Sequence, residues 1–416
     1  MNSPTTNANA KTIVECRSNS VFCCKSGFFS RSGDASGISV LPLLAMLFAL
    51  LFSSSPWAQA QSETLVYSFG PSPDGASPGA PLIIDSNGNL YGTTQDGGAD
   101  RFGTVFKITA GGVETVLHSF PANASDGAVP EAGLVMDSSG NLYGTTSSGG
   151  AHQVGTVFKV TPTGTETVLY SFTGGADGGI PYGGLVLDSE GNLYGTTRSG
   201  GAYYGGTVFE LTSTGTETVL HSFGNGHDGQ YPYAGLVRDS NGNLYGTTMN
   251  GGTAGFGTVF EINSGGSEIV LYNFAGTAGN DGAYPYAPLV RDSAGNLYGT
   301  TVGGTGGPSI AFEITASGNE KIFYVFPSTD QAAGGLVMDS NGNLYGTTRY
   351  GGTHKVGEVY EITASGTVPT LHSFVKSQRD GYNPLAGLVL DSHGNLYGTT
   401  FRGGRHSNGT VFKLVP

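Results

Sequence analysis

One hexapeptide, Asn-Leu-Tyr-Gly-Thr-Thr, occurs seven times in the chain, and successive copies start 47 to 53 residues apart. The copies start at Asn89, Asn141, Asn192, Asn243, Asn296, Asn343 and Asn395. So regular a period indicates one structural unit copied in tandem. Units of this kind either close into a ring or stack in a line, which restricts the possible folds to a few.

Each unit contains four short segments with the composition of β-strands. In the third copy these segments are 184–188, 192–197, 206–211 and 217–223, which we name strands a to d. They are rich in Val, Phe, Tyr and Thr and are separated by Gly- and Asn-containing turns. No helical periodicity is found after residue 60, so the sequence predicts an all-β fold.

Seven units of four antiparallel strands predict a seven-bladed β-propeller, with strand a nearest the axis and strand d outermost. The last copy ends in a strand c, at 409–414, and its strand d is missing there. A matching segment stands at the start of the repeat region, at 63–69. We therefore expect the N-terminal strand to complete the last blade and close the ring. A linear β-solenoid is the alternative, but it gives no reason for this permuted start.

The first 60 residues have the features of a signal peptide. An apolar run at 38–52 follows several basic residues and ends near Ala58-Gln59-Ala60, a small-x-small pattern. We predict cleavage after Ala60 and a single propeller domain over 61–416, with an uncleaved N-terminal anchor as the alternative. The protein is then secreted, either extracellular or at the cell surface, with the periplasm as the alternative location.

Charge and cysteine content exclude several classes of function. All three cysteines and the tryptophan lie in the predicted signal peptide, so neither disulfides nor thiol chemistry are expected in the remainder. That remainder carries 14 basic and 29 acidic residues, a formal charge of −15. Such a charge disfavours binding to nucleic acid or to anionic membranes, and no membrane span is expected in it.

The recurring polar residues are predicted to be structural. One Asp precedes each a–b turn, as Asp188 does. A second stands in an Asp-Gly pair in six of the d–a crossovers, and the remaining one has Asp330-Gln331; both positions suit tight turns. His118, His221 and His372 alternate with tyrosines at one position of strand d, on different blades, too far apart to share a metal. We therefore predict no metal site and no cofactor.

A glycine inside each strand b indicates the close approach of a bulky group. We expect this group to be a phenylalanine of strand c or d from the neighbouring blade, such as Phe209 or Phe223.

The unit Gly-Leu-Val-x-Asp-Ser-x-Gly-Asn-Leu-Tyr-Gly-Thr-Thr, followed by Gly-Gly and Gly-Thr-Val-Phe, resembles the GloVer tandem-repeat family of exported bacterial proteins. The resemblance covers residues 63 to 414 and implies a secreted or surface protein of no established activity. The a–b hairpin is also similar to that of NHL-type propellers.

Function is expected on the loops where the copies differ, because a rigid scaffold presents them. The b–c loops differ most and, in a propeller, open on the same face as the d–a crossovers. The predicted ligand-binding residues are Arg101, Arg198, Tyr203, Tyr204, Arg349, Tyr350, His354, Lys355, Phe401, Arg402, Arg405 and His406. The crossovers add Tyr182, Tyr231, Tyr233, Tyr284, Tyr286 and Tyr382.

These loops predict a binding or scaffold module, acting as a monomer, whose ligand is an extracellular polysaccharide or an envelope partner protein. Six of the predicted loop residues are basic in an acidic protein, which favours an anionic polymer. The starts of the a strands are small and apolar, with Glu131 the one carboxylate beside them, so no catalytic residues are predicted. A polysaccharide lyase or hydrolase and a purely structural envelope protein are the alternatives.

Overall fold

A computed structural model describes residues 62–122, 125–276, 281–304, 307–328 and 330–416. Over these residues the protein is all-β, with no α-helix. No helix there is long and apolar enough to cross a membrane. The predicted signal peptide lies outside the described residues.

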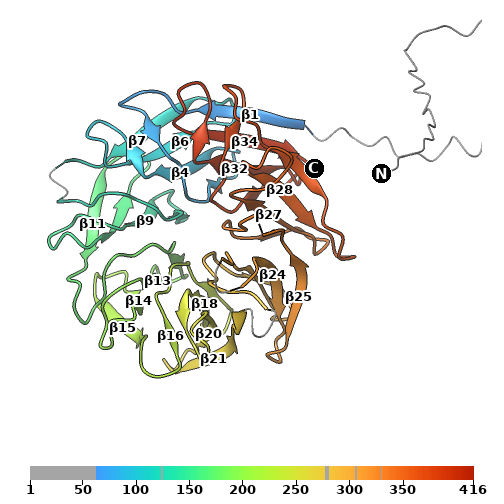
Figure 1. The fold of residues 1–416 in the computed structure, drawn as a ribbon. Helices are drawn as coiled ribbons and strands as arrows, with labels where there is room; N and C mark the ends of the chain where they lie inside the picture. Colours follow the sequence, from blue (N-terminus) through green and yellow to red (C-terminus); the bar gives the residue numbers. More distant parts are fainter. Residues whose placement is uncertain (1–61, 123–124, 277–280, 305–306, 329) are drawn as a thin grey trace, which may run out of the picture. The chain divides into compact units, whose positions relative to one another are not determined.

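The strands form seven four-stranded antiparallel sheets around an axis, as the repeat predicted (Figure 1). In the order a to d, blade 1 contains β3 (Ile83–Ile84), β4 (Leu90–Thr94), β6 (Thr104–Ile108) and β7 (Glu114–Ser119), and blade 2 contains β8 (Val135–Met136), β9 (Leu142–Thr146), β10 (Thr156–Val160) and β11 (Glu166–Ser171). Blade 3 contains β12 (Val186–Leu187), β13 (Leu193–Thr197), β14 (Thr207–Leu211) and β15 (Glu217–Ser222). Blade 4 contains β17 (Val237–Arg238), β18 (Leu244–Thr248), β20 (Thr258–Ile262) and β21 (Glu268–Asn273). Blades 5 and 6 are β22 (Val290–Arg291), β23 (Leu297–Thr300), β24 (Ile310–Ile314) and β25 (Glu320–Val325); and β26 (Val337–Met338), β27 (Leu344–Thr348), β28 (Glu358–Ile362) and β29 (Thr370–Ser373).

The seventh blade is built from both ends of the repeat region. Its inner strands are β31 (Val389–Leu390), β32 (Leu396–Thr400) and β34 (Thr410–Val415), and its outermost strand is β1 (Ser62–Ser68). β1 runs antiparallel to β34, with Glu63 opposite Leu414 and Ser68 opposite Thr410. The predicted closure of the ring by the N-terminal strand is confirmed, and it removes the free edge that β34 would otherwise present.

The core lies between the blades. At each boundary an aromatic ring of strand d in one blade contacts an aromatic ring of strand c in the next; Phe69 and Phe106, for example, lie 5.2 Å apart edge to face. Both rings are fully buried. Because every blade is buried on two faces, most strand residues are apolar without strict alternation.

The strand-b glycines do make room for an aromatic ring, but the predicted origin of that ring was wrong. A Cβ on Gly195 would lie 2.7 Å from Cζ of Phe209, which stands opposite it on strand c of the same blade. Leu185 of the same blade fills the rest of the space. Phe223 lies one boundary further on, against Phe260 of the next blade.

Candidate functional site

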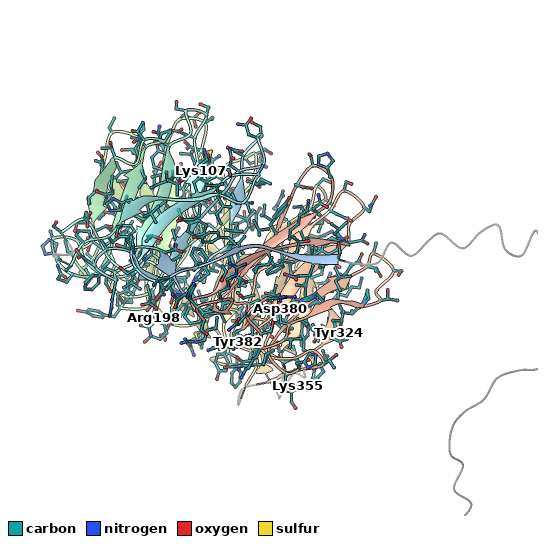
Figure 2. The ribbon with its side chains drawn as sticks, turned by 90° about the horizontal axis from the view of Figure 1, so that it is seen from above. Lys107, Arg198, Tyr324, Lys355, Asp380 and Tyr382 are labelled. Atoms are coloured by element: carbon teal, nitrogen blue, oxygen red, sulfur yellow. The ribbon has the colours of Figure 1, made fainter. Side chains whose placement is uncertain are left out.

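The b–c loops and the d–a crossovers share one face of the propeller, as expected. They pair through two-residue ribbons: β2 (Gly75–Ala76) with β5 (Asp96–Gly97), β16 (Gly229–Gln230) with β19 (Asn250–Gly251), and β30 (Gly381–Tyr382) with β33 (Arg402–Gly403). Figure 2 shows Arg198, Tyr382 and Lys355 on one side of the molecule and Lys107 on the other. We call the side with the loops and crossovers the loop face.

The opposite face carries the a–b turns and their aspartates, here named the turn ring: Asp85, Asp137, Asp188, Asp239, Asp292, Asp339 and Asp391. Each carboxylate accepts hydrogen bonds from groups of its own turn. Asp85 accepts hydrogen bonds from the backbone N–H groups of Asn87 and Asn89, at 2.9 and 2.8 Å, and from the side chains of Asn89 and Tyr91. The predicted structural role of these aspartates is confirmed.

Burial alone would raise the pKa of Asp85, but these four donors outweigh it and hold the pKa below its ordinary value. A depression of about 890 Å³ lies beside the turns of blades 2 and 3. Its carboxylates are Asp137, Asp188 and Glu190, and each already accepts a hydrogen bond within its own turn. Few polar groups on this face are therefore left for a ligand.

A cavity of about 500 Å³ lies on the propeller axis where the a strands begin, and residues from all seven blades line it. Two positions of the repeat supply most of the variation in its wall. The first, which we call the entry position, is the residue directly before the small residue that opens strand a. The entry residues are Gly79, Glu131, Tyr182, Tyr233, Tyr286, Ala333 and Leu385.

The second position directly follows the Thr-Thr pair of strand b. From this position Gln95, Met249, Val302 and Arg349 line the cavity. Because both positions vary from blade to blade in an otherwise repeated frame, the cavity has no sevenfold symmetry. It presents a different set of groups on each side.

Three successive entry residues form an aromatic ladder. The rings of Tyr182 and Tyr233 are stacked, with centres 4.9 Å apart and planes 16° apart, and Tyr233 lies 4.9 Å from Tyr286 at 33°. The guanidinium of Arg198 lies over Tyr233, 5.2 Å from the ring centre. Stacking on both neighbours fixes the orientation of Tyr233 before any ligand arrives.

The entry residue next to the ladder is an acid. Burial, and then the charge of Asp96, raise the pKa of Glu131 to about 7. Among the described residues, no hydrogen bond or ion pair engages the Glu131 carboxyl group. Burial, followed by the charge of Glu131, also raises the pKa of Tyr182, and the pKa of Tyr286 is raised to about 12. The tyrosines therefore stay neutral, while Glu131 can be either neutral or charged near pH 7.

Arg349 supplies a cation to the same cavity. Its guanidinium lies 5.1 Å from the ring centre of Tyr350, and its buried Nε makes no hydrogen bond to any described group. The cavity thus combines flat aromatic faces, one titratable acid and one fixed cation with an unsatisfied donor.

The small residues at the starts of the a strands have a steric cause. A Cβ on Gly235 would lie 2.8 Å from the backbone oxygen of Gly184 in the preceding blade, and one on Gly387 would lie 2.9 Å from that of Gly335. At these two boundaries the innermost backbones of neighbouring blades pass too close for a side chain, whereas blades 1 and 5 carry Pro81 and Pro288 at the same position. Because the residues that open the a strands are small, space remains for the cavity, which the larger entry residues line.

The twelve residues predicted as a ligand site do not gather at one place. Arg349 lines the axial cavity and Arg198 packs on its wall. Tyr203, Tyr204 and Tyr350 are exposed on loop tips, at 51, 77 and 36% of their surface. The remaining exposed residues of the set are Arg101, His354, Lys355, Arg402, Arg405 and His406, and Phe401 is half-buried beneath Arg402. Of the twelve residues, Arg349 is the one among the described lining residues of the axial cavity.

Sequence reasoning noticed the crossover tyrosines and Glu131 but did not combine them into one site. It compared the small residues that open strand a, and the informative position stands one residue earlier. In an alignment of the seven copies, the entry position is a highly variable column next to columns that vary little. That contrast would have identified it.

Searches for similar proteins support the fold and the family. Two solved structures are similar over 85 and 84% of the chain, with TM-scores of 0.57 and 0.59, each at 13% identity. Both are extracellular domains of a Bacteroides thetaiotaomicron protein, one described as a putative one-component system and the other as a putative hybrid two-component system. The chain spans about two fifths of each, and at this identity the likeness shows the fold alone. No curated protein matches the sequence.

The Gloeobacter/Verrucomicrobia repeat matches three overlapping segments, residues 50–188, 137–334 and 303–416. Together they cover every blade described above. The expected relationship to the GloVer repeat is confirmed, and the chain belongs to the Gloeobacter/Verrucomicrobia repeat family.

Proposed function

We propose that this protein is an exported binding module that holds a saccharide in the axial cavity. The observation that carries the proposal is the ladder of Tyr182, Tyr233 and Tyr286 along the wall of a 500 Å³ cavity. Its size falls within the range of small-molecule sites. The predicted export supports an extracellular ligand, as does the extracellular origin of the two structures with the same fold.

The groups around the ladder suit a sugar chain. Tyr182 and Tyr286, at the two ends of the ladder, can offer their outer ring faces to the C–H faces of sugar rings, and the ladder hydroxyls can hydrogen-bond. The carboxyl group of Glu131 can accept hydrogen bonds from sugar hydroxyls, and Arg349 can donate hydrogen bonds to a hydroxyl or a carboxylate. The rest of the cavity wall is mostly apolar, and Gln95 and Gln331 add further hydrogen-bonding side chains.

The predicted alternative of a polysaccharide hydrolase receives less support. Hydrolysis of a glycosidic bond ordinarily requires two carboxyl groups flanking the bond. Glu131 is the one carboxyl group among the described residues that line the cavity. We therefore propose binding rather than hydrolysis.

A glycan array followed by calorimetry with the best oligosaccharide tests this function. Tyr233→Ala should weaken binding by about tenfold or more, because truncating a central aromatic contact typically costs about 2 kcal/mol. Tyr204→Ala is the matched control, since Tyr204 is a 77% exposed tyrosine of the same face that does not line the cavity. It should bind like wild type.

Two results would contradict the axial site. One is wild-type protein that binds no glycan on the array. The other is binding that survives Tyr233→Ala but is lost on replacing Arg402 and Arg405 with Ala, which would return the site to the predicted loop tips.

A further inference from the structure

Neighbouring blades meet on their outer side through a repeated three-residue contact. A Tyr or His of strand d in one blade faces the Asp of the following d–a crossover. A Glu that begins strand d of the next blade lies beside that Asp. Tyr272 illustrates the contact, because its hydroxyl oxygen lies within hydrogen-bond distance of both Asp281, at 2.7 Å, and Glu320, at 2.9 Å.

We name these glutamates the outer ring: Glu63, Glu114, Glu166, Glu217, Glu268 and Glu320. At the remaining boundary Val368 stands in place of the Glu. In three of the four tyrosine contacts, those of Tyr67, Tyr170 and Tyr272, a neutral hydroxyl stands between two acids. It can donate only one proton, so one carboxylate is always poorly satisfied.

Histidine replaces tyrosine at three of the boundaries, and at two of these the contact changes character. Nε2 of His118 lies 3.2 Å from Asp126, and Nε2 of His372 lies 3.5 Å from Asp380. Both pairs are close enough for an ion pair, although the geometry at each Nε2 is not that of a hydrogen bond. At the third boundary, by contrast, His221 forms a hydrogen bond to Asp228 at 3.2 Å.

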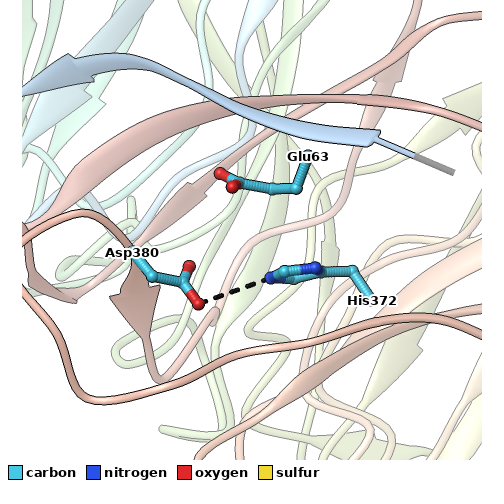
Figure 3. A group of neighbouring side chains, drawn as sticks. All are labelled: Glu63, His372 and Asp380. Atoms are coloured by element: carbon cyan, nitrogen blue, oxygen red, sulfur yellow. Dashed lines mark ion pairs between the residues drawn. The ribbon is translucent and has the colours of Figure 1, made fainter.

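The third member of each of these two groups is a glutamate with an unmet acceptor. Oε1 of Glu166 and Oε1 of Glu63 are buried and accept no hydrogen bond. One ligand atom from each of His118, Asp126 and Glu166 lies within 4.8 Å of the others, and the same holds for Glu63, His372 and Asp380. Figure 3 shows the second group, with Glu63 carried by β1 and turned toward His372 and Asp380.

We propose that these two groups are zinc sites between blades, each with one imidazole and two carboxylates as ligands and a fourth position open to water. Zinc binds these ligand types at about 2.0–2.2 Å, so two ligands on one tetrahedral ion lie roughly 3.3–3.5 Å apart. The His–Asp separations of 3.2 and 3.5 Å match that spacing. A divalent cation balances the two carboxylates and satisfies the glutamate oxygen that no donor reaches.

The surroundings of Asp380 fit a metal ligand. The backbone N–H groups of Gly381 and Val375 donate to its two oxygens at 2.7 and 2.8 Å and fix its orientation. Such outer contacts are what hold ligating carboxylates in place. The site also joins β1 to the blade next to its own, so zinc there would clamp the strand that closes the ring.

Zinc content of the untagged full chain, measured after equilibrium dialysis against zinc sulfate, tests the proposal. We expect two zinc ions per chain, one after His118→Tyr, one after His372→Tyr and none after both. The substitutions are conservative for folding, since tyrosine occupies this position in four of the seven blades. His354→Tyr, on an exposed loop tip, is the control and should keep both ions.

Zinc should also raise the melting temperature of wild-type protein by several degrees, because a ligand that binds only the folded state stabilises it. The double variant should not respond to zinc. Calcium, which prefers six to eight oxygen ligands, should not displace zinc from wild type. Wild-type protein that retains no zinc, or a double variant that retains as much as wild type, overturns the proposal. Neither result bears on saccharide binding at the axis.

Discussion

The turn ring and the outer ring carry the same charged group in opposite surroundings. Each aspartate of the turn ring is met by donors, and the pKa of Asp85 is held low although burial opposes this. Each glutamate of the outer ring meets another acid instead: burial, then the charge of Asp74, raise the pKa of Glu114 to about 7. The repeat therefore satisfies the turn aspartate in every blade and, at six of the seven boundaries, sets a glutamate beside a second acid.

This difference separates structure from function in a repeat protein. The turn ring is the same in all seven copies and is complete within each blade. Each glutamate of the outer ring contacts residues of the preceding blade, and the strand-d residue in that contact is a tyrosine in some blades and a histidine in others. The groups that are left unsatisfied at blade boundaries are the ones that a ligand, a proton or a metal can complete.

The largest effect is expected from removing the strand that brings Glu63 into the outer ring. Deleting residues 62–68 exposes the full edge of β34 and unpacks Phe69 from Phe106, whereas the turn ring keeps all its residues. An exposed edge strand pairs with other chains, so we expect aggregation and a large fall in melting temperature. Calorimetry and light scattering measure both. A truncated chain that melts like the full chain would show that closure contributes little.

A smaller effect is expected from pH, and its sign differs between the two rings. Five glutamates of the outer ring, Glu63, Glu114, Glu166, Glu217 and Glu268, have their pKa raised from 4.5 to about 7 in the folded protein. Their contribution to stability is present below the unfolded pKa of about 4.5 and is lost as pH rises through about 7. The turn ring has lowered pKa values, so its contribution is lost only as pH falls below about 4.

In the presence of a chelator, the melting temperature should therefore fall as pH rises from about 5 to about 8. Burial lowers the pKa of His118 and His221, which opposes this trend below about 6.5, but the glutamates outnumber them. Melting curves in matched buffers provide the measurement. A melting temperature that rises over this interval would mean that the outer ring is satisfied by groups other than protons.

The sequence predicted the outer parts of each blade more accurately than the inner ones. In the third copy, the expected strand at 192–197 became β13 (Leu193–Thr197), and the one at 217–223 became β15 (Glu217–Ser222). The expected strand a, 184–188, shrank to β12 (Val186–Leu187). Gly184, the first residue of the expected strand, lies near the axis beside the backbone of the preceding blade. At the other end, the carboxylate of Asp188 accepts a hydrogen bond from the backbone N–H of Asn192. Strand composition carries no information about this crowding.

The candidate sites were harder to predict because their members come from different copies. Tyr182, Tyr233 and Tyr286 stack only because consecutive blades are turned by a fixed angle about one axis, which single-copy reasoning does not include. Glu63 and His372 meet only after the ring closes. The three histidines were correctly placed on different blades, yet their carboxylate partners from the adjoining blade were not foreseen. Which residues meet across a blade boundary is set by how the blades are arranged in the closed ring. The sequence pattern within one copy does not contain this information.

The smallest and most direct comparison of the two rings uses one substitution in each ring, both in blade 1. Asp85→Ala removes four hydrogen bonds and leaves two backbone N–H groups of the turn to water, so we expect a loss of about 2–4 kcal/mol in the free energy of unfolding. Glu114→Gln removes a charge that lies against Asp74 and keeps the shape of the side chain. At about pH 8, where Glu114 would be ionised, this variant should be as stable as wild type or slightly more stable, because the repulsion between the two acids is gone. Urea denaturation of both variants at pH 8 and at pH 5 measures these differences, and the gain from Glu114→Gln should disappear at pH 5, where wild-type Glu114 is already protonated. If Glu114→Gln destabilised the protein at pH 8 as much as Asp85→Ala did, the two rings would be equivalent and the contrast drawn from their surroundings would fail.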